Sequence, residues 1–177
     1  MKKQTIVMII ALVIICLAPT IRNKIMNSVI RYETPEESLK KSGPRGADLV
    51  DVFEDKGIAL VIWKEKDGVF SDEIIAKDNR GWTTLTVTYK DYKKTRFDNG
   101  FVCIKEIKGK YVVEVMIIVR EDEGVPNSIV DNLESKFILN SYTIQSGGKI
   151  VYGLLVSEEK FPDDYKVIID GLEVPLY

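Results

Sequence analysis

The chain has 177 residues, of which 45% are hydrophobic and 29% are charged, a balance typical of globular proteins. It contains no histidine, which excludes Ser-His-Asp and Cys-His nucleophiles, HExxH zinc sites and other histidine-based metal centres. The first 26 residues hold four basic and no acidic residues, so the remainder carries 27 acidic against 21 basic residues. Nucleic-acid binding depends on Lys and Arg neutralising phosphates, so no nucleic-acid partner is expected for this acidic remainder.

An uncharged, mostly aliphatic segment runs from Thr5 to Ile21. A helix of this length reaches about 25 Å, against about 30 Å for the hydrocarbon core of a bilayer, which suits a short spanning helix or a long signal-peptide core. No small-x-small cleavage site follows the segment, and the bulky Ile15 precedes Cys16 where a lipoprotein signal needs a small residue. We therefore expect a retained single-pass anchor. A cleaved signal peptide and a buried soluble helix are the alternatives.

The helical spacing of apolar residues continues beyond this segment to Ile30, which predicts an amphipathic juxtamembrane extension. The expected domain organisation is therefore an anchor with its extension over residues 1–31 and a β-rich domain over residues 32–177. Basic residues lie on both sides of the apolar segment, so charge alone leaves its orientation open. Because the amino-terminal head is short, we expect the N-terminus in the cytoplasm and the C-terminal domain outside the cell membrane.

The chain after the anchor predicts one short helix followed by strands. Thr34 as the N-cap, Pro35 at the first position and Glu37 at the third form a capping box, which predicts a helix over Thr34–Lys41. Beyond Ala47, apolar runs bounded by turn residues are typical of strands. The expected strands are Leu49–Glu54, Ile58–Lys64, Glu73–Lys77, Thr84–Tyr89, Phe101–Ile107, Tyr111–Arg120, Phe137–Gln145, Ile150–Ser157, Tyr165–Ile169 and Leu172–Leu176.

Turn sequences typical of hairpins separate several of these strands, namely Asp98-Asn99-Gly100, Lys108-Gly109 and Asp170-Gly171. Gly and Asn supply the positive φ that tight turns need, so neighbouring strands are expected to pair antiparallel. The apolar residues of Pro126–Leu133 follow a period of 3.6, which predicts one further short helix. The expected fold class is mainly β (α+β), an antiparallel β-sheet domain with a short N-terminal helix, preceded by a single transmembrane helix.

The segment Tyr89–Phe97 interleaves basic and aromatic side chains and is the best candidate binding surface in the chain. It could hold an anionic polymer of the cell envelope, a lipid headgroup or an acidic partner protein. The alternative is a twisted hairpin whose exposed lysines discourage edge-to-edge pairing. Trp63 and Trp82 could floor a ligand groove, or they could be core aromatics. The candidate ligand- or partner-binding residues are Tyr89, Lys90, Tyr92, Lys93, Lys94, Arg96, Trp63 and Trp82.

The other chemistry-bearing residues are interpreted as structural. The acidic groups Glu121-Asp122-Glu123 and Asp163-Asp164 lie beside turn residues without the spacing of a calcium loop, so we expect solvated turns. Cys103 stands in an apolar run with nothing to lower its pKa and is expected in the core. Cys16, if embedded in the membrane, cannot pair with it, so no disulfide is expected. The sequence indicates no catalytic residue, no metal ligand and no cofactor.

Short motifs along most of the chain are shared with a known group of proteins. They are the Lys2-Lys3 head, the helix Thr34–Lys41, the strand Ile58–Trp63, the step Gly81-Trp82, the strand Ile150–Leu155 and the closing stretch Tyr165–Pro175. In this order the chain resembles a loose group of small, mostly uncharacterised secreted or membrane-anchored proteins of Gram-positive bacilli. The resemblance implies an extracytoplasmic location and a β-rich fold, and it implies no activity. The chain lacks the lipobox Cys of many members.

The function that these observations favour is a non-catalytic, membrane-anchored extracytoplasmic binding or interaction module. Its expected partners are the membrane, through residues 5–21, and a protein or an anionic envelope polymer. One alternative is a hydrolase of cell-envelope glycans that uses carboxylates alone, which requires two acidic side chains about 5–10 Å apart across a cleft. A second alternative is a regulatory subunit of a membrane complex.

Overall fold

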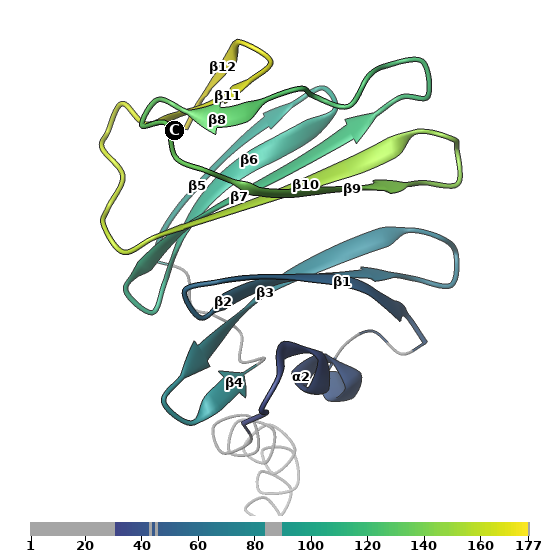
Figure 1. Ribbon diagram of the computed structural model, residues 1–177, viewed down its shortest axis with the longest axis vertical. Helices are drawn as coiled ribbons and strands as arrows, with labels where there is room; N and C mark the ends of the chain where they lie inside the picture. The colour runs from purple at the N-terminus through teal and green to yellow at the C-terminus, as the bar shows by residue number, and fades with distance from the viewer. Residues whose placement is uncertain (1–30, 43, 45, 84–89, 177) are drawn as a thin grey trace, which may run out of the picture.

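The computed structural model describes residues 31–42, 44, 46–83 and 90–176. It consists of antiparallel sheets stacked in layers, with one short helix at the end where the described chain begins (Figure 1). The mainly β, antiparallel class expected from the sequence is therefore confirmed. The expected anchor over residues 5–21, its extension to residue 30 and the expected strand 84–89 lie outside the described residues. Within the described ranges, no helix has the length and hydropathy needed to cross a bilayer.

Helix α2 (Pro35–Ser42) begins where the capping box predicts it. The backbone N–H of Glu37 donates to Thr34 Oγ1 at 3.2 Å, and the Glu37 carboxylate accepts from the N–H of Glu33 at 3.3 Å. Two N–H groups near the helix start thus have hydrogen-bond acceptors. The acidic residues of the first turn lie at the positive end of the helix dipole and stabilise it.

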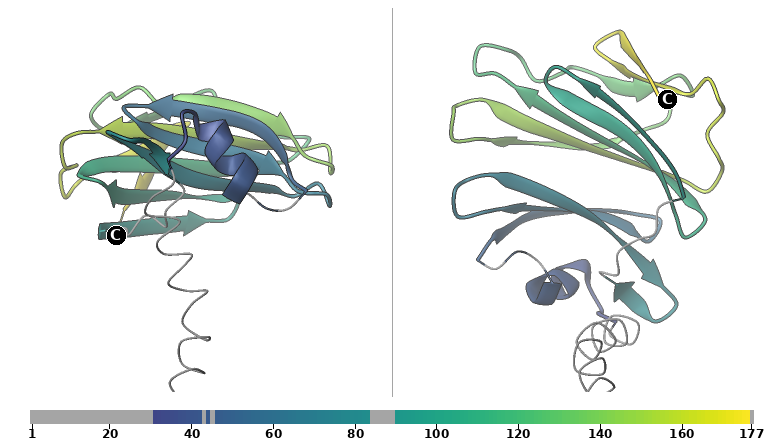
Figure 2. Two further views of the ribbon diagram at one scale, coloured as in Figure 1. Left: turned by 90° about the horizontal axis from the view of Figure 1, so that it is seen from below. Right: turned by 180° about the vertical axis from the view of Figure 1, so that it is seen from behind.

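Helix α2 and the chain before it pack against the outer face of sheet A. Its strands, in spatial order, are β1 (Asp48–Asp55), β2 (Ile58–Lys64), β3 (Phe70–Asp78) and β4 (Gly81–Thr83). Seen from below, α2 lies across this outer face (Figure 2). Six consecutive residues of β2, Ile58–Trp63, are buried, because both faces of sheet A are covered. Trp63 and Trp82 belong to the small core on the outer face.

Sheet B is the middle layer, and sheet C covers its far face. Sheet B contains β5 (Lys90–Phe97), β6 (Gly100–Ile107), β7 (Lys110–Val119), β10 (Lys149–Ser157) and β9 (Ile138–Thr143), in that order. Sheet C contains β12 (Leu172–Pro175), β11 (Lys166–Ile169) and β8 (Ile129–Asp131). The view from behind shows the layers A, B and C following one another away from α2 (Figure 2).

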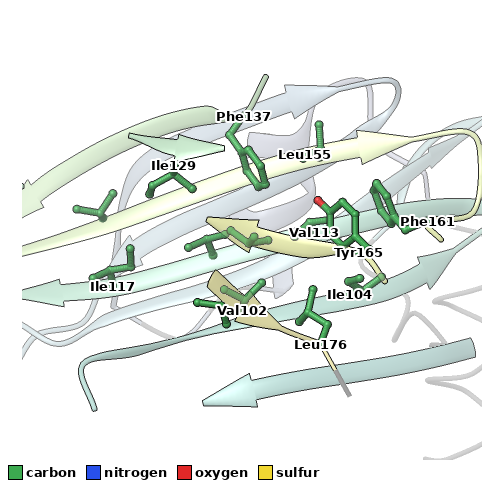
Figure 3. Close-up of a cluster of buried hydrophobic side chains, with 14 of the residues drawn as sticks. Val102, Ile104, Val113, Ile117, Ile129, Phe137, Leu155, Phe161, Tyr165 and Leu176 are labelled. Atoms are coloured by element: carbon green, nitrogen blue, oxygen red, sulfur yellow. The ribbon is translucent and has the colours of Figure 1, made fainter. Parts of the chain in front are cut away.

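Two hydrophobic cores hold these layers together. Between sheets A and B, residues such as Leu60, Ile74 and Leu154 are fully or almost fully buried. Between sheets B and C, a second core contains Val113 and Phe161 among others (Figure 3). Strands at the centre of sheet B therefore bury both faces, which explains why β7 and β10 read in the sequence as nearly continuous apolar runs.

The expected helix over Pro126–Leu133 is wrong. Ile129–Asp131 forms strand β8, which pairs with β11, and the chain then turns. The Asp131 carboxylate accepts hydrogen bonds from the N–H groups of Leu133 and Ser135, which commits these donors to a turn. Pairing with a distant strand thus overrides a helical period of only a few residues. The short strand β4 and the charged strand β5 were also missing from the expected strands.

Asp51 fastens the edge of sheet A to the edge of sheet B. Its Oδ1 accepts from the N–H of Val52 at 2.7 Å, and its Oδ2 accepts from Tyr142 Oη at 2.6 Å and from Asn140 Nδ2 at 2.9 Å. We expect Asp51→Ala to lower the free energy of unfolding by about 2 kcal/mol, because the half-buried Tyr142 hydroxyl loses a charged acceptor. Urea denaturation of the full chain in detergent measures this. The exposed Asp48→Ala is the matched control, and equal losses in the two variants would contradict the assignment.

Candidate functional site

A bulge in strand β5 shapes the main candidate site. The pairing of β5 with β6 shifts register between Lys90 and Lys93. Side chains normally alternate between the faces of a strand, and a bulge interrupts that alternation. Tyr92 and Lys93 accordingly both line one cleft, on the side of sheet B that faces sheet C. The segment that the sequence indicated as a binding surface therefore contributes two neighbouring side chains to a single site.

The cleft has a volume of about 300 Å³ and combines aromatic walls with charged groups. Its aromatic lining comes from β5, from the start of β7 and from the loop between β10 and β11. The aromatic side chains are Tyr92, Tyr111, Phe161 and Tyr165. Lys93 and Lys160 supply two exposed ammonium groups, and Asp163 is the one carboxylate among the described lining residues. The cleft therefore offers flat apolar faces beside an excess of positive charge.

The aromatic wall is held in place by stacking. The rings of Phe161 and Tyr165 lie with their centroids 4.2 Å apart, and Tyr111 meets Phe161 edge-on at 6.4 Å. Figure 3 shows Phe161 and Tyr165 side by side above Ile104 and Leu176. Tyr92 is 49% exposed, so its ring remains accessible at the mouth of the cleft. Such a wall can stack against the apolar face of a sugar ring or against a planar ligand group.

Asp131, which sequence analysis missed, positions this wall from behind. Its Oδ2 accepts a hydrogen bond from Tyr165 Oη at 3.0 Å, while its Oδ1 accepts from the N–H groups of Leu133 and Ser135 at 3.0 and 2.7 Å. Asp131 is only 2% exposed. Burial and the nearby Asp131 charge raise the pKa of the Tyr165 phenol, so Tyr165 stays a neutral donor. The only sequence signal for this role is an Asp that ends an apolar run just before a turn.

The remaining candidate residues lie elsewhere. Lys94 points to the opposite side of β5, where its Nζ lies 3.7 Å from the centre of the Phe101 ring. Arg96 is exposed farther along the same strand. Trp63 and Trp82 are 6% and 1% exposed and pack in the core on the outer face of sheet A, as one of the two interpretations expects. Tyr89 and the side chain of Lys90 lie outside the described residues.

A buried acidic pair lies between sheets A and B, away from the cleft. Glu114 of β7 is 1% exposed, and its Oε2 accepts from Lys105 Nζ at 2.5 Å and from Cys103 Sγ at 3.3 Å. Asp72 of β3 faces it from sheet A. Burial and the Glu114 carboxyl raise the pKa of Asp72 to about 8. Burial opposes the ionisation of Glu114, but contacts with Asp72, Lys105 and Cys103 still lower its pKa. Asp72 therefore holds a proton while Glu114 is ionised.

This pair does not have the geometry of a carboxylate hydrolase. Glu114 is 1% exposed and accepts from Lys105 and Cys103, so it is closed to a sugar, whereas glycoside hydrolysis uses carboxyls about 5–10 Å apart with room for the sugar. Cys103 is fully buried, and burial together with the Glu114 charge raises the pKa of its thiol, which confirms it as a core residue. The described part of the chain contains no group of three or more Cys, Asp or Glu side chains arranged to hold a metal ion.

The fold and the cleft together define a layered antiparallel β protein with a small aromatic, lysine-edged surface cleft. Comparison of the chain with protein-family models, with curated proteins and with solved structures finds no match.

Proposed function

We propose that the chain is a membrane-anchored, extracytoplasmic binding module without catalytic activity, and that its cleft holds an anionic polymer of the cell envelope. The anchor in this proposal is the apolar segment over residues 5–21, with the described domain outside the cell. The observation that carries the proposal is the convergence of aromatic faces with Lys93 and Lys160 in one open cleft. The single carboxylate there, Asp163, provides no second acid for hydrolysis.

The chemistry of the cleft suits a polymer built of sugar rings and phosphate groups. Tyr92 and Tyr111 offer ring faces to a sugar, and an ammonium group on either lysine can pair with a phosphate oxygen. The volume of about 300 Å³ lies at the small end of ligand sites, which fits one repeat of a chain that passes through. An open cleft of this kind accepts such a chain without enclosing its ends.

The proposal predicts that the two cleft lysines govern binding of a phosphorylated glycan. We expect the full chain in nanodiscs to bind dextran phosphate more tightly than dextran, and Lys93→Gln with Lys160→Gln to weaken that binding roughly tenfold, since each lost charged contact costs about 0.7 kcal/mol. Raised salt should weaken wild-type binding in the same direction. Isothermal titration calorimetry with both polymers measures the effect.

The matched control is Lys136→Gln with Lys149→Gln, which removes the same charge from two exposed lysines outside the cleft. This control should bind as the wild type does. Equal binding of dextran phosphate and dextran by the wild type would contradict the proposal. So would equal weakening in the two double variants, because it would mean that binding follows overall charge.

A further inference from the structure

Three cationic side chains from separate parts of the chain surround one carboxylate, that of Asp78 at the end of β3. Asp78 Oδ2 accepts from Arg31 Nε at 3.0 Å, and a guanidinium nitrogen of Arg31 also lies 3.0 Å away. Arg80, in the turn between β3 and β4, lies 3.7 Å from the same oxygen. Lys108, in the turn between β6 and β7, lies 3.8 Å from it. This Asp78 cluster therefore carries two positive charges in excess.

The outer members of the Asp78 cluster are available to a ligand. The Arg80 side chain is 60% exposed and that of Lys108 is 40% exposed, whereas Arg31 is 10% exposed. Among the described residues, Asp78 is the only acidic side chain in salt-bridge range of either outer cation. Burial and the charges of Arg31 and Arg80 lower the pKa of Lys108 in spite of Asp78. Contacts of 3.7 and 3.8 Å are long for ion pairs, so both cations can turn to another anion at little cost.

The Asp78 cluster lies where the described chain begins. Tyr32 pairs with Trp82 of β4 through hydrogen bonds of 3.1 and 2.8 Å, which fixes Arg31 beside the turn. This close approach requires glycine at position 81, since φ there is +125° and a Cβ would lie 2.5 Å from the Tyr32 carbonyl oxygen. Figure 1 places β4 and α2 at this end of the molecule, with sheet C at the opposite end. Residue 31 is also the last residue of the segment 1–31 that is proposed to hold the anchor and its extension.

We propose that Arg80 and Lys108 bind the phosphate groups of anionic phospholipids in the membrane that holds the anchor, and that Asp78 positions Arg31 behind them. This inference rests on the proposed membrane anchorage. Two clustered cations at a bilayer surface each strengthen attachment to anionic lipid roughly fivefold. With lipid contact at this end, sheet A would lie nearest the membrane, sheet B next and sheet C farthest from it. The cleft between sheets B and C would then face the envelope.

Hydrogen–deuterium exchange of the full chain in nanodiscs tests the proposal. We expect the β3–β4 and β6–β7 turns to exchange roughly fivefold or more slowly in discs of phosphatidylcholine with phosphatidylglycerol than in discs of phosphatidylcholine alone. The variant Arg80→Gln with Lys108→Gln should lose that difference. The control Lys136→Gln with Lys149→Gln should keep it. A double variant that keeps the protection, or a wild type without it, would overturn the assignment.

Two further measurements distinguish a failure of the phospholipid site from a failure of the membrane anchor. Inorganic phosphate added to phosphatidylcholine discs should give no comparable protection, and equal protection would identify a general phosphate site in place of a membrane contact. Alkaline carbonate extraction of membranes tests the anchor itself. A chain that resists extraction but shows no lipid-dependent protection overturns only the phospholipid site. A chain that is extracted overturns both the anchorage and the phospholipid site.

Discussion

Replacing Asp131 with alanine is expected to lower the free energy of unfolding by about 3–5 kcal/mol. The side chain is 2% exposed and accepts hydrogen bonds from Leu133 N–H, Ser135 N–H and Tyr165 Oη. Each buried or half-buried donor left without an acceptor costs about 1–3 kcal/mol. Because Tyr165 also lines the cleft, the variant should bind dextran phosphate more weakly even at temperatures where it stays folded.

Two further variants test whether the destabilisation comes from the lost Asp131 acceptor or whether any substitution in this region destabilises the fold. Asp131→Asn keeps an acceptor oxygen for the two backbone donors and is expected to cost about 1–2 kcal/mol. Asp164→Ala, at an exposed position next to Tyr165, should change stability by less than about 0.5 kcal/mol. Urea denaturation followed by circular dichroism gives all three values. If Asp131→Ala lowers the free energy of unfolding no more than Asp164→Ala does, the Asp131 carboxylate does not position Tyr165 in the cleft lining.

The acidic pair between sheets A and B is expected to make the protein less stable as the pH rises from about 5 to 8. The pKa of Asp72 is about 8 in the folded protein, raised by burial and by Glu114, against an ordinary value of 3.8. Between these values the folded state keeps a proton that the unfolded state has released, so increasing pH favours unfolding. The limiting slope is about 1.4 kcal/mol per pH unit, and we expect about 1 kcal/mol per unit.

The variant Asp72→Asn should remove this slope. The amide stays neutral at every pH, so the variant should match the wild type near pH 5 and exceed its stability at pH 8. The groups that face Asp72 act in both directions: the positive charges of Lys94 and Lys105 favour its ionisation, and Glu114 opposes it. Tyr152, from β10, is buried nearby and stays neutral, because burial and the neighbouring acidic pair raise its pKa.

Chemical denaturation at a series of pH values from 5 to 8.5 measures the effect. Glu114 has the opposite shift, so its contribution to stability is lost only as the pH falls below its ordinary value of 4.5, outside that range. Parallel pH profiles for the wild type and Asp72→Asn would show that Asp72 is ionised in the folded protein, and would contradict the assignment of the proton to Asp72.

Local signals in the sequence predicted much of the secondary structure. The Lys108-Gly109 and Asp170-Gly171 turns have positive φ at both residues, as hairpin turns require. The capping box at Thr34 predicted the start of α2. These features depend on neighbours in the chain, and a single sequence contains that information. By contrast, β8 has three residues, and only its pairing with the distant β11 makes it a strand.

The candidate site was predictable only in part, for the same physical reason. Tyr92 and Lys93 stand in a segment whose composition already indicated binding. Phe161 and Tyr165 reach the cleft because the loop after β10 folds back over sheet B, and nothing local in the sequence specifies that path. Glu114 was hidden in an apolar run that predicts a buried strand, and its partner Asp72 comes from another sheet. Pairings across layers require the assembled fold.

The central claim, that the cleft is the ligand-binding site, is tested most directly by mapping where a ligand protects the chain. Hydrogen–deuterium exchange of the full chain in phosphatidylcholine nanodiscs, with and without dextran phosphate, reports this peptide by peptide. We expect slower exchange at Tyr92–Lys93 and in the loop over residues 160–165, with no change at the β3–β4 turn. Protection confined to other surfaces, or none at saturating polymer, would contradict the claim.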